Sequence, residues 1–256
     1  MKRILCILSA AIMLLSVFGC AVSQTVTPQS IKKVGVLKVG VKDDVPNFGY
    51  FNINTNQYEG MEIDLARLIA RDLTGDGTNV EFTSVTTNTR GPMLDNGDVD
   101  IIIATFTITD ERKLLYNFSA PYYTDSIGIM VKNDSGITDT SDLNGKTIGV
   151  VQAAPTKDAL QPVVSKINVS FSQYPSAREA KAALDSGITD AFAIGCSILN
   201  GYLDDTTMIL PNKYSPQPLG VATKLGNKVL ATYINNLINK WLQDGTIETL
   251  TSKYNI

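Results

Sequence analysis

The sequence predicts an α/β protein with mainly parallel sheets. Short apolar runs typical of strands alternate along the chain with segments that have a helical apolar period, and this alternation favours strands joined by helical crossovers. About 225 residues follow the N-terminal segments, which is large for one hydrophobic core and suits two lobes. The order of the elements does not by itself show where such lobes divide.

The first half of the chain begins with a clear strand and a clear helix. Apolar residues alternate in the segment LKVGV, and a helical apolar face runs from Met61 to Leu73. The expected elements are a strand at residues 37–41, an aromatic loop at 45–51, a surface turn at 52–57, a helix at 61–73, a strand from residue 80, a short helix at 92–96 and a buried strand at 99–104.

The second half of the chain repeats this alternation. Ser176 and Glu179 have the spacing of a capping box, and residues 229–242 form a strongly amphipathic helix that Gly245 ends. The expected elements are extended segments at residues 127–132 and 146–151, a helix opened by Pro155, a helix from 176 to 186, a strand at 190–194, an extended segment at 220–223, the helix at 229–242 and a final short helix.

The N-terminus has the features of a secretory signal. A positive start, Met1-Lys2-Arg3, precedes an apolar run to Phe18 that is shorter than the roughly 20 residues of a membrane-spanning helix. The run ends Val17-Phe18-Gly19-Cys20, which resembles a bacterial lipobox. We therefore expect a signal peptide at residues 1–19, a lipid anchor on Cys20 and a polar tether at 20–30, the alternative being an ordinary signal with an incidental cysteine.

Composition excludes several classes of function. The chain has 22 basic and 25 acidic residues, and removal of Lys2 and Arg3 leaves a net charge of −5, so a nucleic-acid partner is not expected. There is no histidine, which excludes Ser-His-Asp and Cys-His nucleophilic sites and removes the commonest metal ligand. After Cys20 the only cysteine is Cys196, which is expected to be a buried apolar filler, with a ligand-facing thiol as the alternative.

Hydroxyl residues at a strand end form the most informative feature of the sequence. The buried strand should stop at Ala104, and Thr105-Phe106-Thr107-Ile108-Thr109-Asp110-Glu111-Arg112 follows. Hydroxyls and free backbone N–H groups there can hold an anion, and a helix start adds its positive end. Arg112, one turn further on, can fork both oxygens of a carboxylate. The segment is a candidate carboxylate clamp, the alternative being a solvated helix start with Arg112 paired to a neighbour.

This segment resembles the amino-acid branch of the bacterial extracellular solute-binding proteins of ABC importers, family 3, and the resemblance covers residues 33–256. It implies a two-lobed fold like that of periplasmic binding proteins, with two mainly parallel sheets flanked by helices and joined by two hinge crossovers. By the resemblance, the crossovers lie near residues 123–129 and 216–221. Lobe 1 would comprise residues 31–126 and 219–256, and lobe 2 residues 127–218.

The resemblance also assigns roles to individual residues. It implies that Arg112 binds the α-carboxylate of the ligand, assisted by Thr107 and by the main chain at Thr105. No catalytic residue, metal or cofactor is expected. The expected ligand-binding residues are Lys42, Arg90, Thr105, Phe106, Thr107, Arg112, Gln152, Ala154, Thr156 and Gly195.

Two of these positions bear on the nature of the ligand. Arg90 and Lys42 match cations that relatives binding acidic amino acids place around the side-chain carboxylate, and such cations favour a dicarboxylate. The alternatives are a helix-start arginine and an exposed lysine at the surface. Phe48, Tyr50 or Phe51 is expected either to roof the pocket or to be an ordinary core or surface aromatic.

Two positions depart from the family pattern. Gly195 stands where relatives that bind α-amino acids place an aspartate for the ligand ammonium, and an unpaired ammonium in a closed cleft would cost several kcal/mol. Ala153 and Pro155 replace part of a Gly-x-Thr/Ser-Thr run and remove one N–H donor. The ammonium could be met by Asp43, Asp44 or a lobe-2 carboxylate, the ligand could lack an amine, or binding could be lost. Restoring an aspartate at Gly195 should then tighten amino-acid binding.

The sequence thus predicts a substrate-binding protein of an ABC importer, which holds an acidic or polar amino acid and closes its lobes on it. An amine-free carboxylate or a modified amino acid is the second hypothesis. A dehydratase-like enzyme on the same fold is less favoured, because no Asp or Glu stands out as an acid/base. A signalling receptor is a further, less favoured alternative. The expected partner is an ABC permease, the protein is expected to be a monomer, and its expected location is the extracellular face of the cell membrane or the periplasm.

Overall fold

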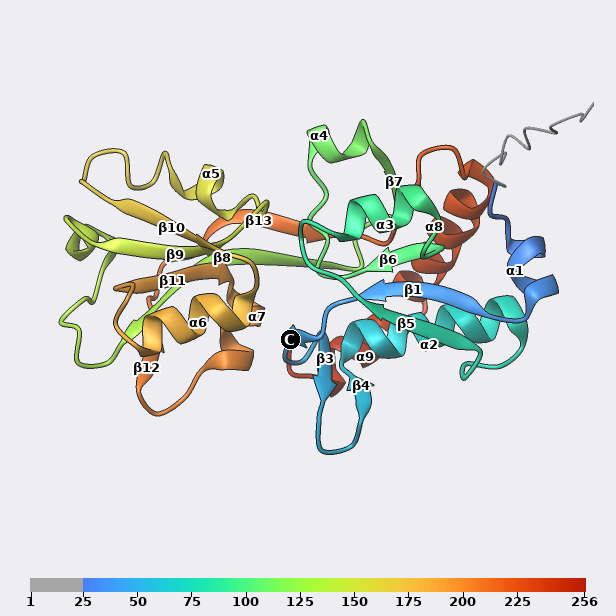
Figure 1. Cartoon of the computed structure of the whole chain (residues 1–256), viewed down its shortest axis with the longest axis horizontal. Coiled ribbons are helices and arrows are strands. Elements are labelled where there is room, and N and C mark those ends of the chain that lie inside the picture. The colour runs from blue at the N-terminus through green and yellow to red at the C-terminus, as the bar shows by residue number, and fades with distance from the viewer. Residues whose placement is uncertain (1–24) are drawn as a thin grey trace, which may run out of the picture.

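A computed structural model of the chain describes residues 25–256. The expected signal peptide at 1–19 and the lipid anchor Cys20 lie outside the described residues. Within them, two sheets form the centres of two lobes that lie end to end along the long axis of the molecule (Figure 1). We call the part around the first sheet lobe 1 and the part around the second sheet lobe 2.

The sheet of lobe 1 has five strands, and it is parallel on one side and antiparallel on the other. Strand β1 pairs in parallel with β5 and β6, whereas β14 runs antiparallel to β6 and β7. The order across the sheet is β5 (Val80–Ser84), β1 (Leu37–Val41), β6 (Ile101–Ile103), β14 (Ala222–Lys224) and β7 (Tyr116–Phe118).

Helices cover both faces of this sheet, and that explains the continuous apolar run in β6. Ile101 and Ile103 pack into one core cluster and Ile102 into another, because successive side chains of a strand point to opposite faces. The helices of lobe 1 are α1 (Pro28–Val34), α2 (Met61–Thr74), α3 (Arg90–Asn96), α4 (Asp110–Lys113), α8 (Lys228–Gln243) and α9 (Thr246–Lys253), and a small sheet of β2 (Asp44–Val45), β3 (Gly49–Asn52) and β4 (Gln57–Glu59) completes it.

The sheet of lobe 2 is also mixed. Strand β9 pairs in parallel with β10 and β11, and β8 runs antiparallel to its neighbours. The order is β10 (Ser170–Tyr174), β9 (Thr147–Val151), β11 (Ala191–Gly195), β8 (Tyr123–Lys132) and β12 (Thr207–Ile209). The flanking helices are α5 (Thr156–Leu160), α6 (Ala177–Asp185) and α7 (Cys196–Tyr202), together with the short 3-10 helix η1 (Thr140–Leu143).

Two long segments connect the lobes. Strand β8 leaves lobe 1 and extends into lobe 2, and β13 (Tyr214–Leu219) returns beside it in antiparallel pairing (Figure 1). Their register sets Asp125 opposite Gln217. Strand β13 thus adds one more antiparallel pair to the sheet of lobe 2.

The α/β class and the two lobes are confirmed, while the sheets are mixed rather than mainly parallel. Helix α2 and helix α8 match their expected ranges closely, because their apolar faces are strongly periodic. The segment 45–51 was expected to be a loop, but it contributes β2 and β3. Helix α1 begins at Pro28, so residues 28–30 of the expected tether are helical; Thr27 caps this helix by accepting the Ser30 N–H at 3.1 Å.

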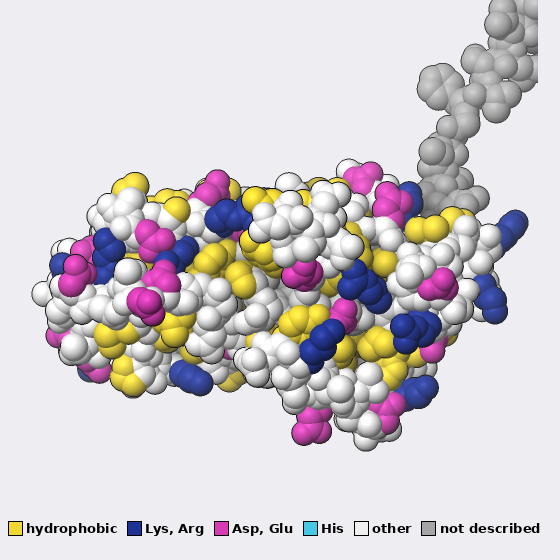
Figure 2. Space-filling model, turned by 90° about the horizontal axis from the view of Figure 1, so that it is seen from below, with side chains coloured by type: hydrophobic (Ala, Val, Ile, Leu, Met, Phe, Trp, Pro, Cys, Tyr) yellow, Lys and Arg dark blue, Asp and Glu magenta, His cyan; other side chains and the backbone are white. Residues whose placement is uncertain are grey.

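Two features of the described residues concern the outside of the molecule: the character of its helices and the distribution of charge on its surface. In residues 25–256 no helix combines the length and the apolar character needed to cross a membrane. Figure 2 shows acidic and basic side chains interspersed over one face of both lobes. This face therefore offers no extended surface of a single charge sign.

Candidate functional site

A pocket lies between the lobes and is walled by both of them. Lobe 1 contributes residues at the ends of β1 and β6 and from α3, and lobe 2 contributes the segments after β9 and β11. Such a position, at the carboxyl ends of strands, is where α/β folds commonly bind ligands. The lining residues are Lys42, Val45, Thr87, Arg90, Thr105, Thr107, Asp125, Val151, Ala154, Pro155, Thr156, Ala177, Ile194, Gly195, Ile198, Gln217 and Leu219.

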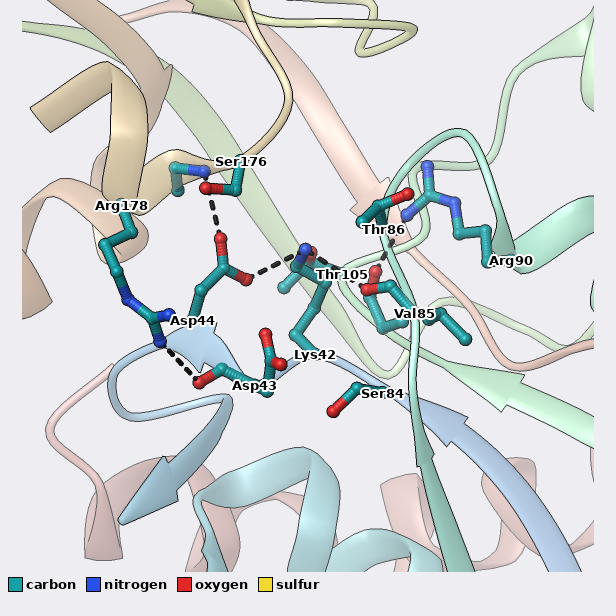
Figure 3. Close-up of polar contacts among 12 residues, drawn as sticks. Lys42, Asp43, Asp44, Ser84, Val85, Thr86, Arg90, Thr105, Ser176 and Arg178 are labelled. Atoms are coloured by element: carbon teal, nitrogen blue, oxygen red, sulfur yellow. Dashed lines mark hydrogen bonds and ion pairs between the residues drawn. The ribbon is translucent and has the colours of Figure 1, made fainter. Parts of the chain in front are cut away.

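Lys42 lines the pocket and forms an ion pair with a carboxylate. Its Nζ lies 2.8 Å from Oδ1 of Asp44 and donates to the Val85 carbonyl at 3.3 Å (Figure 3). Both side chains are buried. Oδ2 of Asp44 accepts the backbone N–H of Ala177, at the start of α6 in lobe 2, at 3.0 Å. The ion pair therefore belongs to a contact that joins the lobes.

Arg90 is the second cation of the wall. It is buried at the start of α3, and its Nη1 donates to the Ala104 carbonyl at 2.8 Å. Its guanidinium carbon lies 3.8 Å from the ring centroid of Phe106, which supplies a cation–π contact. Burial, and secondarily the charge of Arg112, lower the pKa of Arg90 to about 9, so it remains charged at neutral pH.

The buried carboxyl group of Glu62 accepts a hydrogen bond from the backbone of the hydroxyl-rich segment. Thr105 has a positive φ of 45°, and in that conformation its N–H donates to Oε1 of Glu62 at 2.6 Å. The Tyr122 hydroxyl donates to the same oxygen at 2.5 Å. Burial raises the pKa of Glu62 to about 7, against the opposing effect of these hydrogen bonds and of the nearby cations. The side chain thus holds Thr105 in a backbone conformation that non-glycine residues seldom adopt.

Arg112 lies at the edge of the pocket and bridges the lobes. Its Nη1 donates to the Thr107 carbonyl of lobe 1 at 2.7 Å, and its Nη2 to the Ala153 carbonyl of lobe 2 at 2.9 Å. It is not among the residues that line the pocket, although its neighbours Thr107 and Ala154 are. Burial lowers the pKa of Arg112 to about 10. An arginine has five N–H donors, so two carbonyl contacts leave donors for a carboxylate.

The wall near Gly195 holds a carboxylate from another strand. Gly195 ends β11 and precedes α7 without a side chain to cap that helix. Asp125, on β8, accepts the Ser197 N–H at 3.1 Å through Oδ2 and the Ser126 N–H at 2.7 Å through Oδ1. It is 5% exposed and lines the pocket, and burial raises its pKa. Gly195 itself carries no carboxylate, and Asp125 supplies one to this part of the wall.

Further hydrogen bonds join the two lobes. Arg178 donates to the Asp43 carbonyl at 3.1 Å, and Asn88 donates to the side chain of Gln152 at 3.1 Å. Tyr202 of α7 donates to the Asp44 carbonyl. These contacts flank the pocket and join residues that are distant in sequence.

The structure brings seven of the ten expected ligand-binding residues into the pocket wall, namely Lys42, Arg90, Thr105, Thr107, Ala154, Thr156 and Gly195. Phe106, Arg112 and Gln152 do not line it: the Phe106 ring packs between Arg90 and Arg112, with its centroid 5.0 Å from the Arg112 guanidinium carbon, and Gln152 makes an interlobe hydrogen bond. The aromatic residues do not roof the pocket; Phe48 is fully buried in the core. Cys196 is also buried and does not line the pocket.

Sequence reasoning missed three polar residues of the wall. Thr87, Asp125 and Gln217 line the pocket, but Asp125 and Gln217 were expected only as parts of the two crossover segments. Asp125 and Gln217 face one another only because β8 and β13 pair in the observed register. No local pattern in the sequence encodes that register. The sequence analysis therefore named Asp43, Asp44 or a lobe-2 carboxylate, and not Asp125, as the acid that could meet the ligand ammonium.

Comparison with known proteins gives consistent matches over most of the chain. Residues 37–255 match the model of the family "Bacterial extracellular solute-binding proteins, family 3". The ABC transporter glutamine-binding protein of Bacillus subtilis is 34% identical over 232 residues, which cover 89% of this chain and 84% of that protein. A glutamine-binding protein of Geobacillus stearothermophilus is 36% identical over 219 residues, which cover 84% of this chain and 81% of that protein.

A solved structure matches at the level of the whole fold. The solute receptor for L-cysteine of Neisseria gonorrhoeae superimposes with a TM-score of 0.81 at 27% sequence identity. The match covers 90% of this chain and 93% of that one. Both lobes and their connection are therefore shared with this receptor.

Proposed function

This chain belongs to family 3 of the bacterial extracellular solute-binding proteins, and we propose that it delivers a polar amino acid with an uncharged side chain to an ABC importer. The observation that carries the proposal is a pocket walled by both lobes and lined by cations of lobe 1 and by a buried aspartate on the connecting strand. A zwitterion presents both a carboxylate and an ammonium, so it complements such a wall.

The charge balance of the wall favours an uncharged side chain on the ligand. Of its charged residues, Lys42 is paired with Asp44 at 2.8 Å. Arg90 and Asp125 then remain, one of each sign, and Arg112 lies at the edge. A glutamate would bring a second carboxylate and would have to compete with Asp44 for Lys42. The relatives named as glutamine-binding proteins support this choice.

An acidic amino acid is the second candidate ligand, and the observation in its favour is that Lys42 and Arg90 both line the pocket. An amine-free dicarboxylate is less favoured, since it would set one of its carboxylates close to Asp125. The proposed role is binding without catalysis, in line with relatives that are transport proteins.

We propose that the α-carboxylate lies at the end of the pocket formed by Thr105, Thr107 and Thr156, within reach of Arg112. The two lobes, residues 31–126 with 219–256 and residues 127–218, would open about β8 and β13 and close over the ligand. Closure requires that the ligand bind the closed form more tightly than the open form, and contacts to both walls provide that difference. A membrane permease would recognise the closed form, at the extracellular face of the membrane or in the periplasm.

Calorimetry and thermal-shift measurements test the proposal directly. The panel consists of L-glutamine, L-glutamate, L-aspartate, L-cystine and succinate. We expect L-glutamine to bind more tightly than L-glutamate, succinate not to bind, and each bound ligand to be recovered unchanged. Binding of succinate alone, or of no amino acid at millimolar concentration, would contradict the proposed function.

Arg112→Ala tests the carboxylate contact, with Arg178→Ala as its matched control. Each arginine donates one hydrogen bond to a backbone carbonyl of the other lobe, at 2.9 Å and 3.1 Å respectively, so both variants weaken closure to a similar degree. Only Arg112 lies beside the hydroxyl-rich end of the pocket. We expect Arg112→Ala to lose about 10- to 100-fold in affinity, the range for a hydrogen bond to a charged group, and Arg178→Ala to lose much less. Equal losses would remove Arg112 from the ligand site.

A further inference from the structure

We propose that Asp125, on the connecting strand β8, is the residue that pairs with the ligand ammonium, in place of a side chain at Gly195. The inference rests on the proposed function, because it presumes that the ligand is an α-amino acid. It also goes beyond that function by assigning selectivity for the amine to one residue outside both sheet-end loops.

The geometry around Gly195 points to this replacement. Strands β11 and β8 are antiparallel, with Gly195 opposite Ile127, so Asp125 lies two positions further along the neighbouring strand. A Cβ built on Gly195 would overlap Oδ2 of Asp125 and lie 3.1 Å from its Cγ. The Asp125 carboxylate therefore occupies the volume next to Gly195 into which a side chain there would extend. Glycine at 195 and aspartate at 125 are sterically coupled.

The surroundings of Asp125 leave its negative charge only partly compensated. Backbone N–H groups and the Ser197 hydroxyl donate to it, and these donors are all neutral. Among the ion pairs of residues 25–256, none includes Asp125. Burial raises the pKa of Asp125, and the nearby charge of Lys213 offsets only part of that rise. A ligand ammonium in the pocket would supply the missing positive charge.

Asp125 also has a structural role, and the two roles can be separated. It accepts the Ser197 N–H at the first turn of α7, whose N-cap residue has no side chain to do so. An asparagine carries no charge, and its one acceptor oxygen, placed where Oδ1 lies, can accept both the Ser126 N–H at 2.7 Å and the Ser197 N–H at 3.3 Å. Capping alone would thus survive Asp125→Asn, whereas pairing with an ammonium would not.

The test compares ligands that differ only in the amine. L-Glutamine is paired with glutaramate, which is glutamine without its α-amine, and L-glutamate with glutarate. For Asp125→Asn we expect the affinity for L-glutamine to fall at least about 10-fold, with the affinity for glutaramate unchanged and a similar melting temperature. Retained affinity for L-glutamine, or an equal loss for both members of the pair, would overturn the inference.

A double substitution tests whether the acid can be moved back across the sheet. Asp125→Ala frees the space beside Gly195, whose φ of −53° accepts any side chain. We expect Asp125→Ala with Gly195→Asp to regain the preference for L-glutamine over glutaramate, and its control, Asp125→Ala with Gly195→Ala, to lack it. Identical behaviour of the two double variants would overturn the inference.

Wild-type binding separates this inference from the proposed function. A wild-type protein that binds glutaramate as tightly as L-glutamine would overturn the role of Asp125 and leave a carboxylate-binding transport protein. A wild-type protein that binds neither L-glutamine nor L-glutamate would overturn both.

Discussion

Glu62→Gln should remove a pH-dependent penalty on the stability of lobe 1. Glu62 is fully buried in α2, its Oε1 accepts hydrogen bonds from Thr105 and Tyr122, and its Oε2 has no hydrogen-bond partner within residues 25–256. A glutamine can keep the accepting oxygen in place and cannot ionise. The charged groups that face Glu62 are Arg90 and Lys42, and both partly offset the cost of its charge.

The size of the effect follows from proton linkage. The pKa of Glu62 is raised from its ordinary value of 4.5 to about 7 in the folded protein, so the folded protein binds this proton more tightly than the unfolded chain does. The resulting stabilisation is fully present below pH 4.5 and is lost as the pH rises to about 7. At about 1.4 kcal/mol for each pH unit between these values, the loss amounts to about 3 kcal/mol.

Urea unfolding of wild type and Glu62→Gln between pH 4.5 and pH 8 measures this difference. The difference in the free energy of unfolding, variant minus wild type, should increase by about 3 kcal/mol from the acid to the alkaline end. Other titrating groups cancel in this difference, and a constant offset would report only how well the amide fits. A difference that stays level across the range would show that Glu62 titrates normally and would refute the reasoning.

Two further substitutions probe the pocket wall and the backbone. Asp44→Asn releases Lys42 from its 2.8 Å ion pair, so calorimetry should show a higher affinity for L-glutamate relative to that for L-glutamine. Asp43→Asn, the control, should leave this ratio of affinities unchanged. An unchanged ratio in Asp44→Asn would show that Lys42 does not contact the side chain of the ligand. Gly60→Ala should lower the free energy of unfolding by more than about 2 kcal/mol, because a Cβ there would overlap a backbone carbonyl at φ +126°. Gly75→Ala, at φ +93° in open space, should cost less in the same denaturation assay.

The sequence predicted those parts of the fold that depend on local periodicity. Helices α2 and α8 bury one apolar face each, and the triplet Ile101–Ile103 is buried on both sides of its sheet. The hairpin of β3 and β4 was missed, since its strands are short and most of their residues are half buried or exposed. The strands β10 and β12 were missed for the same reason, because their burial is partial and they lie at sheet edges.

The candidate site divides in a similar way. The hydroxyl-rich segment and the arginine after it could be identified from the sequence, because they are contiguous and follow a buried strand. The sequence could not show which of the charged side chains are paired with one another. Whether Lys42 is free depends on Asp44, and the placement of Asp44 depends in turn on the start of α6 in the other lobe. Such a contact joins segments more than a hundred residues apart and leaves no local signature.

The sequence by itself determined the class of the fold, the family and a set of polar residues at strand ends. Helical and strand periods, and the resemblance of the segment after β6, were enough for that. Only the tertiary structure decided which acid faces the cleft. Gly195 reads as a missing carboxylate along the chain, but the pairing of β8 with β11 brings Asp125 to the same place. Strand register is a long-range property, so the sequence alone did not show which acid lies beside Gly195.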